Sequence, residues 1–149
     1  KIMKRISLNV IDYEINNINV NWWKQIMSVF LKPGHNFEIR CWKNEKEVIE
    51  KALKYGKLNE AEKSKNEISI IGILSEKMIQ DILAEPKPDN YDKWTDFFTI
   101  NIKDNFCSAH YGAEIYIYDL TDHDVEIIKQ IISPIQDFFS FGVFDMEKD

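Results

Sequence analysis

The sequence predicts an α+β fold, with helices packed on a single mixed or mainly antiparallel sheet. Short apolar runs with period-two alternation, typical of strands, interchange with runs that have helical spacing and polar N-cap residues. Apolar residues make up 44% and aromatic residues 13% of the 149 residues, enough for one packed core. Only five glycines and four prolines are present, and no repeat or linker divides the chain. We expect one domain, residues 1–149, with the order βαβαβαββαβ.

Six segments have the composition of strands. In the first, Ile6, Leu8 and Val10 alternate on one face, and the phase then changes at Ile11, which predicts a bulge. The segment Ile68–Leu74 is apolar on both faces, which predicts a central strand. The predicted strands are Arg5–Ile15, Phe37–Trp42, Ile68–Leu74, Trp94–Lys103, Phe106–Asp119 and residues 138–144.

Four segments have helical periodicity, and each follows a residue whose side chain can accept a backbone N–H bond at a helix start. These predicted N-caps are Asn21, Asn44, Ser75 and Thr121. An acidic residue stands three positions after two of them, Glu47 and Asp124, which is the capping-box spacing. Residues 57–67 are polar and predict a loop or an irregular helical turn, and residues 85–94, with two prolines, predict an exposed loop.

Cys107, three residues before His110, raises the possibility of a nucleophile with its base. The pair Asp104-Asn105 favours a two-residue hairpin loop because both side chains tolerate positive φ. Such a loop sets Ile102 opposite Cys107, and this register predicts that Cys107 is buried and reduced on the apolar face.

The same register places His110 on the opposite, polar face of the hairpin, opposite Thr99. Glu114 shares that face but stands about 13 Å further along the strand, so no contact with the imidazole is expected. We therefore expect no Cys–His dyad. With only two cysteines, Cys41 and Cys107, the sequence predicts no disulfide framework.

A cluster of acidic residues and one histidine stands at the start of the fourth predicted helix, where the acids complement the helix dipole. The cluster lacks the glycine and the spacing of an EF-hand. The sequence also contains no P-loop, dinucleotide-binding, nucleophile-elbow or zinc-protease motif. It therefore predicts no metal, no cofactor and no enzymatic activity.

The charge is uneven along the chain. Residues 85–149 contain 14 acidic residues against five lysines, whereas residues 1–84 contain 11 acidic against 14 basic residues. An acidic half repels nucleic acid and anionic lipid and attracts a basic protein, and aromatic side chains ringed by carboxylates suit such a partner. The expected partner contacts are Asp89, Tyr91, Asp92, Trp94, Asp96, Asp119, Asp122, Asp124 and Glu126.

The abundance of isoleucine, lysine and asparagine is typical of an AT-rich bacterial or phage coding sequence. A small, acidic bacterial α+β chain that lacks motifs resembles the immunity proteins of bacterial polymorphic-toxin and contact-dependent inhibition systems. The resemblance covers the general character of the whole chain and no motif, so it assigns no residue a role. It implies a cytoplasmic inhibitor that binds and neutralises one cognate toxin, often a basic nuclease. Two alternatives remain open: a small enzyme or ligand-binding domain that uses the polar face around His110, Thr99 and Glu114, or an adaptor subunit of a larger assembly.

Overall fold

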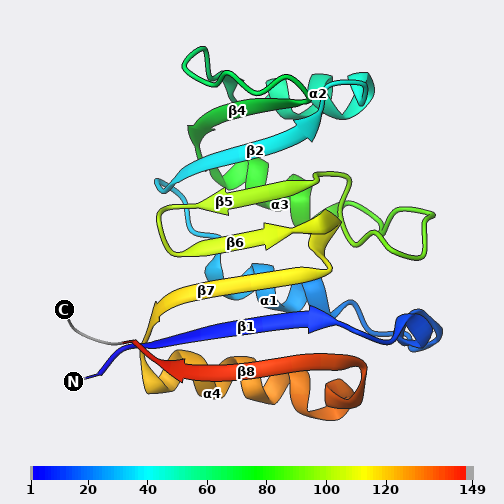
Figure 1. The fold of residues 1–149 in the computed structure, drawn as a ribbon, viewed down its shortest axis with the longest axis vertical. Coiled ribbons are helices and arrows are strands. Elements are labelled where there is room, and N and C mark those ends of the chain that lie inside the picture. Colours follow the sequence, from blue (N-terminus) through cyan, green and yellow to red (C-terminus); the bar gives the residue numbers. More distant parts are fainter. Residues whose placement is uncertain (1, 147–149) are drawn as a thin grey trace.

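The computed structural model describes residues 2–146, which form an α+β fold built on one antiparallel sheet (Figure 1). Within these residues eight strands follow the order β3-β4-β2-β5-β6-β7-β1-β8, and each neighbouring pair is antiparallel. The strands are β1 (Lys4–Val10), β2 (Asn36–Trp42), β3 (Lys57–Leu58), β4 (Glu67–Ile73), β5 (Thr99–Ile102), β6 (Phe106–Ala109), β7 (Glu114–Leu120) and β8 (Phe139–Asp145).

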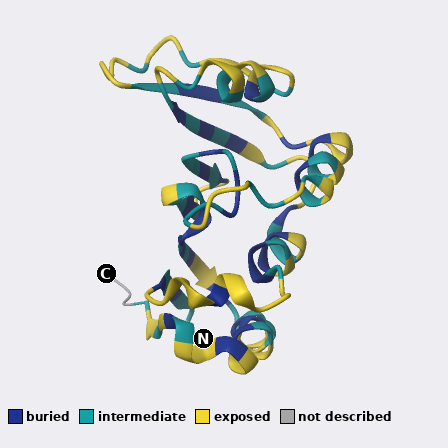
Figure 2. Cartoon of the chain, turned by 90° about the vertical axis from the view of Figure 1, so that its right-hand side faces the viewer, coloured by how far each residue is buried: buried dark blue, intermediate teal, exposed yellow. Residues whose placement is uncertain are grey.

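The described residues also form four α-helices and three 3-10 helices. The helices are α1 (Trp22–Phe30), α2 (Lys46–Leu53), α3 (Glu76–Ala84), α4 (Asp122–Ile132), η1 (Tyr13–Asn17), η2 (His110–Gly112) and η3 (Ser133–Phe138). The α-helices cover one face of the sheet and leave the other uncovered, with the buried residues between the two layers (Figures 1 and 2). None of the helices in residues 2–146 is both long and apolar enough to cross a membrane.

Three of the four helix starts are confirmed. The side chains of Asn21, Ser75 and Thr121 each accept the backbone N–H bond expected of an N-cap, and Thr121 forms a complete capping box. The α2 start is different: Glu45 is the N-cap without a side-chain bond, since its carboxylate accepts the N–H of Trp42 instead. The predicted cap at Asn44 is therefore wrong by one residue.

Two strand predictions need correction. The phase change after Val10 marks the end of β1 rather than a bulge, since Ile11 is exposed and Asp12 already caps η1. The run Ile68–Leu74 corresponds to β4, which lies beside the two-residue edge strand β3 rather than at the centre of the sheet. Ile73, at its end, is largely exposed.

The predicted strand Phe106–Asp119 is in fact two strands, β6 and β7, separated by η2. His110, Tyr111 and Gly112 all have positive φ and reverse the chain there. A Cβ at Gly112 would lie 2.8 Å from Nε1 of Trp23, so both the conformation and the close packing require glycine. The side chains of Trp22 and Trp23 are fully buried beneath this part of the sheet.

The β5–β6 turn has three loop residues instead of the predicted two. Asn105 is bonded to β7, because its carbonyl accepts the N–H of Tyr118, and Ile102 therefore pairs with Phe106. The register shifts by one, so that Cys107 lies opposite Asn101 on the uncovered face. The prediction that Cys107 faces Ile102 in the core is wrong.

Candidate partner-binding site

The segment between α3 and β5, residues 85–98, contains five of the predicted partner contacts, and Trp94 anchors it. Trp94 is only 4% exposed, and its ring lies 5.5 Å from that of Trp22, measured between centroids. Its backbone N–H donates to the carbonyl of Tyr111 in η2 at 2.8 Å. The expectation that Trp94 is an exposed contact is therefore corrected, because its side chain belongs to the core.

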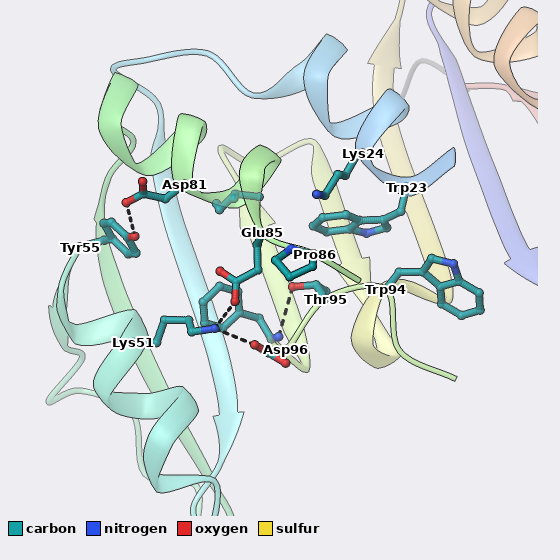
Figure 3. Close-up of a pocket in the computed structure, with 12 residues that line it drawn as sticks. Trp23, Lys24, Lys51, Tyr55, Asp81, Glu85, Pro86, Trp94, Thr95 and Asp96 are labelled. Carbon is teal, nitrogen blue, oxygen red and sulfur yellow. Dashed lines mark hydrogen bonds and ion pairs between the residues drawn. The ribbon is translucent and has the colours of Figure 1, made fainter. Parts of the chain in front are cut away.

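Asp96 is a second anchor of this segment. Its carboxylate pairs with Nζ of Lys51 in α2 at 2.7 Å, and Glu85 binds the same ammonium group (Figure 3). Burial lowers the pKa of Lys51, but the hydrogen bonds that Lys51 donates to these two carboxylates outweigh burial and raise that pKa overall. Lys51 thereby ties α2 to both ends of the loop.

The cleft of Figure 3, between Trp23, Lys51 and Trp94, lies on the helix side of this segment. Its free volume is about 20 Å³, which is room for about one water molecule. Tyr55 donates a hydrogen bond to Asp81 at its far wall, at 2.6 Å. The cleft is thus a packed junction that positions the loop, and the charges of Lys51, Glu85 and Asp96 in it are satisfied by one another.

The other side of the loop is exposed and meets η1. The amide Nδ2 of Asn16 donates to the carbonyl of Tyr91 at 2.8 Å. The rings of Tyr13 and Tyr91 contact edge to face, with centroids 5.5 Å apart. Tyr91 is 67% exposed and Tyr13 is 38% exposed, so two segments far apart in the sequence present two tyrosines at one place.

Four carboxylates surround these tyrosines. Asp12 and Glu14 flank Tyr13 and are exposed, as is Asp89, whereas Asp92 is half-buried. None of the four forms an ion pair with another residue of the part that the structure describes. We name this surface the acidic aromatic patch; it consists of Asp12, Tyr13, Glu14, Asp89, Tyr91 and Asp92.

The two nearby lysines lie close to aromatic rings and form no ion pair with the patch acids, although the ammonium group of Lys87 also donates to the carbonyl of Asn90 and lies within the electrostatic reach of Asp92 and Asp89. Nζ of Lys87 lies 5.3 Å from the ring centroid of Trp94, and Nζ of Lys93 lies 4.2 Å from that of Tyr111. Burial lowers the pKa of Lys87, and the negative charges of Asp92 and Asp89 act in the opposite direction without overcoming burial. Burial, followed by the negative charge of Asp92, raises the pKa of Tyr13.

The predicted contacts from Asp119 to Glu126 lie elsewhere. They lie at the far end of β7 and in α4, with the length of β7, seven residues or roughly 23 Å, between them and η2. Asp124 is engaged in the capping box of α4, while Asp119, Asp122 and Glu126 are exposed. The two predicted acidic segments therefore do not form one continuous surface.

Searches against family models, curated proteins and solved structures find no match to this chain. The functional interpretation therefore rests on the chemistry of its own residues.

The residues first considered for catalysis are arranged differently from the prediction. Nε2 of His110 lies 2.8 Å from a carboxylate oxygen of Glu114, because the η2 turn brings together two residues that a continuous strand would separate. The predicted lack of contact is therefore wrong, as is the placement of His110 on the face opposite Cys107, since Glu114 and Cys107 share the uncovered face.

Cys107 nevertheless does not have the environment of a nucleophile. Burial raises the pKa of its thiol, and the nearby charges of Glu114 and Glu38 raise it further, whereas a reactive cysteine requires a lowered pKa. Among the described residues no hydrogen bond joins Cys107 to His110. The His110 side chain is 64% exposed, so it does not lie in a deep pocket.

The uncovered face holds another charged cluster, centred on Arg40 in β2. Its guanidinium pairs with Glu38, Glu62 and Glu67 at 2.9 to 3.1 Å. The hydrogen bonds that Arg40 donates to Glu62 and Glu67, together with the negative charge of Glu38, raise its already high pKa. This cluster is internally satisfied, in contrast to the acidic aromatic patch, whose carboxylates lack a cation.

Sequence reasoning identified Tyr91, Asp89 and Asp92 but missed Asp12, Tyr13 and Glu14. The local signal for the latter was present: Asp12, followed by two asparagines at positions 16 and 17, is typical of a turn rather than of a strand. The pairing of this turn with Tyr91 is a tertiary contact that no local pattern reveals.

Proposed function

We propose that this protein binds a basic protein through the acidic aromatic patch and neutralises it, as bacterial immunity proteins do with their cognate toxins. One observation supports this most strongly. The hydrogen bond from Asn16 to Tyr91 joins segments 75 residues apart and brings together two exposed tyrosines, in segments whose four carboxylates form no ion pair within residues 2–146. A basic side chain of a partner would supply the missing positive charge.

The physical roles of the patch residues differ. Carboxylates at the rim raise the association rate by attracting a basic surface, and tyrosines slow dissociation because they bury a large area with few rotatable bonds. The anchoring of the loop by Trp94 and by the Lys51–Asp96 pair limits the entropy lost on binding. A partner therefore meets a surface that is already formed.

The test is affinity capture from the native host, followed by quantitative mass spectrometry of the bound proteins. Three baits are compared: the wild type, the patch variant Asp89→Lys/Tyr91→Ala, and the control Asp122→Lys/Glu126→Lys, which carries a larger charge change at the other acidic segment. A basic protein retained by the wild type and the control but lost from the patch variant is the expected result.

Neutralisation is tested separately from binding. The captured protein is expressed in a sensitive host, where co-expression of the wild type should restore growth and co-expression of the patch variant should not. Retention by all three baits would place the interface elsewhere. Binding to the patch without any effect on growth would support an adaptor role instead.

A further inference from the structure

The last strand, β8, forms one edge of the sheet, and its outward backbone groups have no partner among residues 2–146. The N–H of Met146 donates to Met3, and that of Ile11 donates to Phe138. Because hydrogen-bonded pairs recur every second residue of an antiparallel ladder, Ser140, Gly142 and Phe144 also bond to β1. The N–H and C=O groups that point away from the sheet are those of Phe139, Phe141, Val143 and Asp145.

This edge lacks the features that usually prevent strand pairing. Residues 139–144 contain no charged residue and no proline, and the strand is seven residues long. The side chains of Phe141 and Val143 point toward the helix layer yet are only partly buried there. Apolar surface and free backbone groups therefore coincide along β8.

We propose that β8 pairs with β8 of a second copy of this chain, antiparallel about a twofold axis at Gly142, so that the two sheets become continuous. In this register Phe141 lies opposite Val143 of the other copy, and Phe139 lies opposite Asp145. All four outward-facing residues find a partner. The proposal does not depend on the proposed function.

Charge and shape favour this register. A twofold axis at Phe141 would set Asp137 opposite Asp145 of the other copy, two acids in direct opposition, which destabilises a strand pair. With the axis at Gly142, each Asp145 faces Phe139 of the other copy, and its charge is already paired with Lys4 of its own chain. The two glycines then meet at the axis without side chains, and each exposed Phe144 ring, which lies over Gly142 of its own strand, has room beside it.

Disulfide trapping tests the register. On the uncovered face, Ser140 stands opposite Phe144 of the other copy in a pair without hydrogen bonds, where Cα atoms are about 4.5 Å apart and a disulfide fits. The two positions are roughly 13 Å apart within one strand and cannot cross-link there. The double variant Ser140→Cys/Phe144→Cys, in a Cys107→Ser background, should therefore form a covalent dimer under mild oxidation, whereas each single variant should not.

Sedimentation velocity of the unmodified chain over increasing concentration supplies the second measurement. A concentration-dependent species of twice the monomer mass is expected, and Val143→Pro should raise its dissociation constant about tenfold or more, because it removes an outward N–H from each copy. A circular dichroism spectrum checks that this variant folds. A monomer at every concentration, or equal cross-linking of the single and double variants, would overturn the proposal.

Discussion

The two acidic segments at opposite ends of β7 contain the same kinds of residues but use them differently. At the start of α4, Asp124 completes a capping box with Thr121, and neighbouring acids lie at the positive end of the helix dipole. At the η1–loop junction, the carboxylates of the acidic aromatic patch form no ion pair within residues 2–146, and the same two segments present two exposed tyrosines that contact each other. Acidic composition alone therefore does not identify an interface; the useful distinction is between carboxylates such as Asp12 and Asp124, which cap helices, and Asp89, which forms no hydrogen bond or ion pair within residues 2–146.

The largest effect should come from the residue that anchors the patch. Trp94→Ala removes a buried aromatic ring that packs on Trp22, and it should lower the free energy of unfolding by about 3–5 kcal/mol. Tyr91→Ala, which removes an exposed ring from the same loop, should change it by less than about 0.5 kcal/mol. Urea unfolding of both variants checks this contrast. A similar loss of unfolding free energy for both variants would show that the loop is not divided into buried anchor residues and exposed residues that are free to contact a partner.

A smaller effect is expected at the helix start. Thr121→Ala should cost about 1 kcal/mol of unfolding free energy because the first turn of α4 loses an N-cap acceptor. Asp89→Ala in the patch should leave the unfolding free energy within about 0.5 kcal/mol of the wild type. Thermal or chemical denaturation measures both. If Asp89→Ala proves as destabilising as Thr121→Ala, the patch acids have a structural role and the contrast fails.

The ion pairs of Lys51 with Glu85 and Asp96 should contribute less to the free energy of unfolding. Lys51→Met leaves Asp96 and Glu85 without their shared cation, and since all three side chains are partly exposed the expected cost is about 1 kcal/mol or below. The backbone amides of residues 86–93 should also exchange with deuterium faster than in the wild type. Unchanged exchange would mean that Trp94 alone fixes the loop.

The pH dependence of stability separates engaged carboxylates from free ones. Hydrogen bonds from Lys77 and then from Tyr55 hold the pKa of Asp81 below its ordinary value. A lowered folded-state pKa gives stability that is present above the unfolded pKa and is lost as the pH falls through the folded one. Denaturation midpoints of the wild type should therefore decline more steeply than those of Asp81→Asn at pH values below about 4. Parallel curves would contradict this assignment.

The predictable parts of the fold are those specified by local signals. The caps at Asn21, Ser75 and Thr121, the strand Phe37–Trp42 and the α+β class follow from side chains that act on their own neighbours. The break between β6 and β7 was missed because His110 and Tyr111 adopt positive φ, which their sequence does not indicate. That missed turn produced both errors about His110, namely its placement on the face opposite Cys107 and its predicted lack of contact with Glu114.

The register error at Cys107 has a tertiary cause. The predicted register, with Cys107 on the apolar face, would place the next residue, Ser108, on the polar face, yet Ser108 is buried and its hydroxyl accepts a hydrogen bond from the indole Nε1 of Trp23. Tertiary contacts, which local sequence does not indicate, also limit what could be predicted of the candidate site. The burial of Trp94 and the meeting of Tyr13 with Tyr91 depend on segments distant in sequence, so composition located the loop without assigning its residues.

The measurement that tests the central claim most directly is the association rate of the captured basic partner with two charge-reversed variants. Asp89→Lys lies in the patch, and Glu126→Lys, the matched control, lies on α4 with the same change of charge. The patch variant should associate several-fold more slowly than the wild type, with a larger difference at low ionic strength, and the α4 variant should differ little. A greater loss for Glu126→Lys, or equal losses for both, would contradict the assignment of the interface to the acidic aromatic patch.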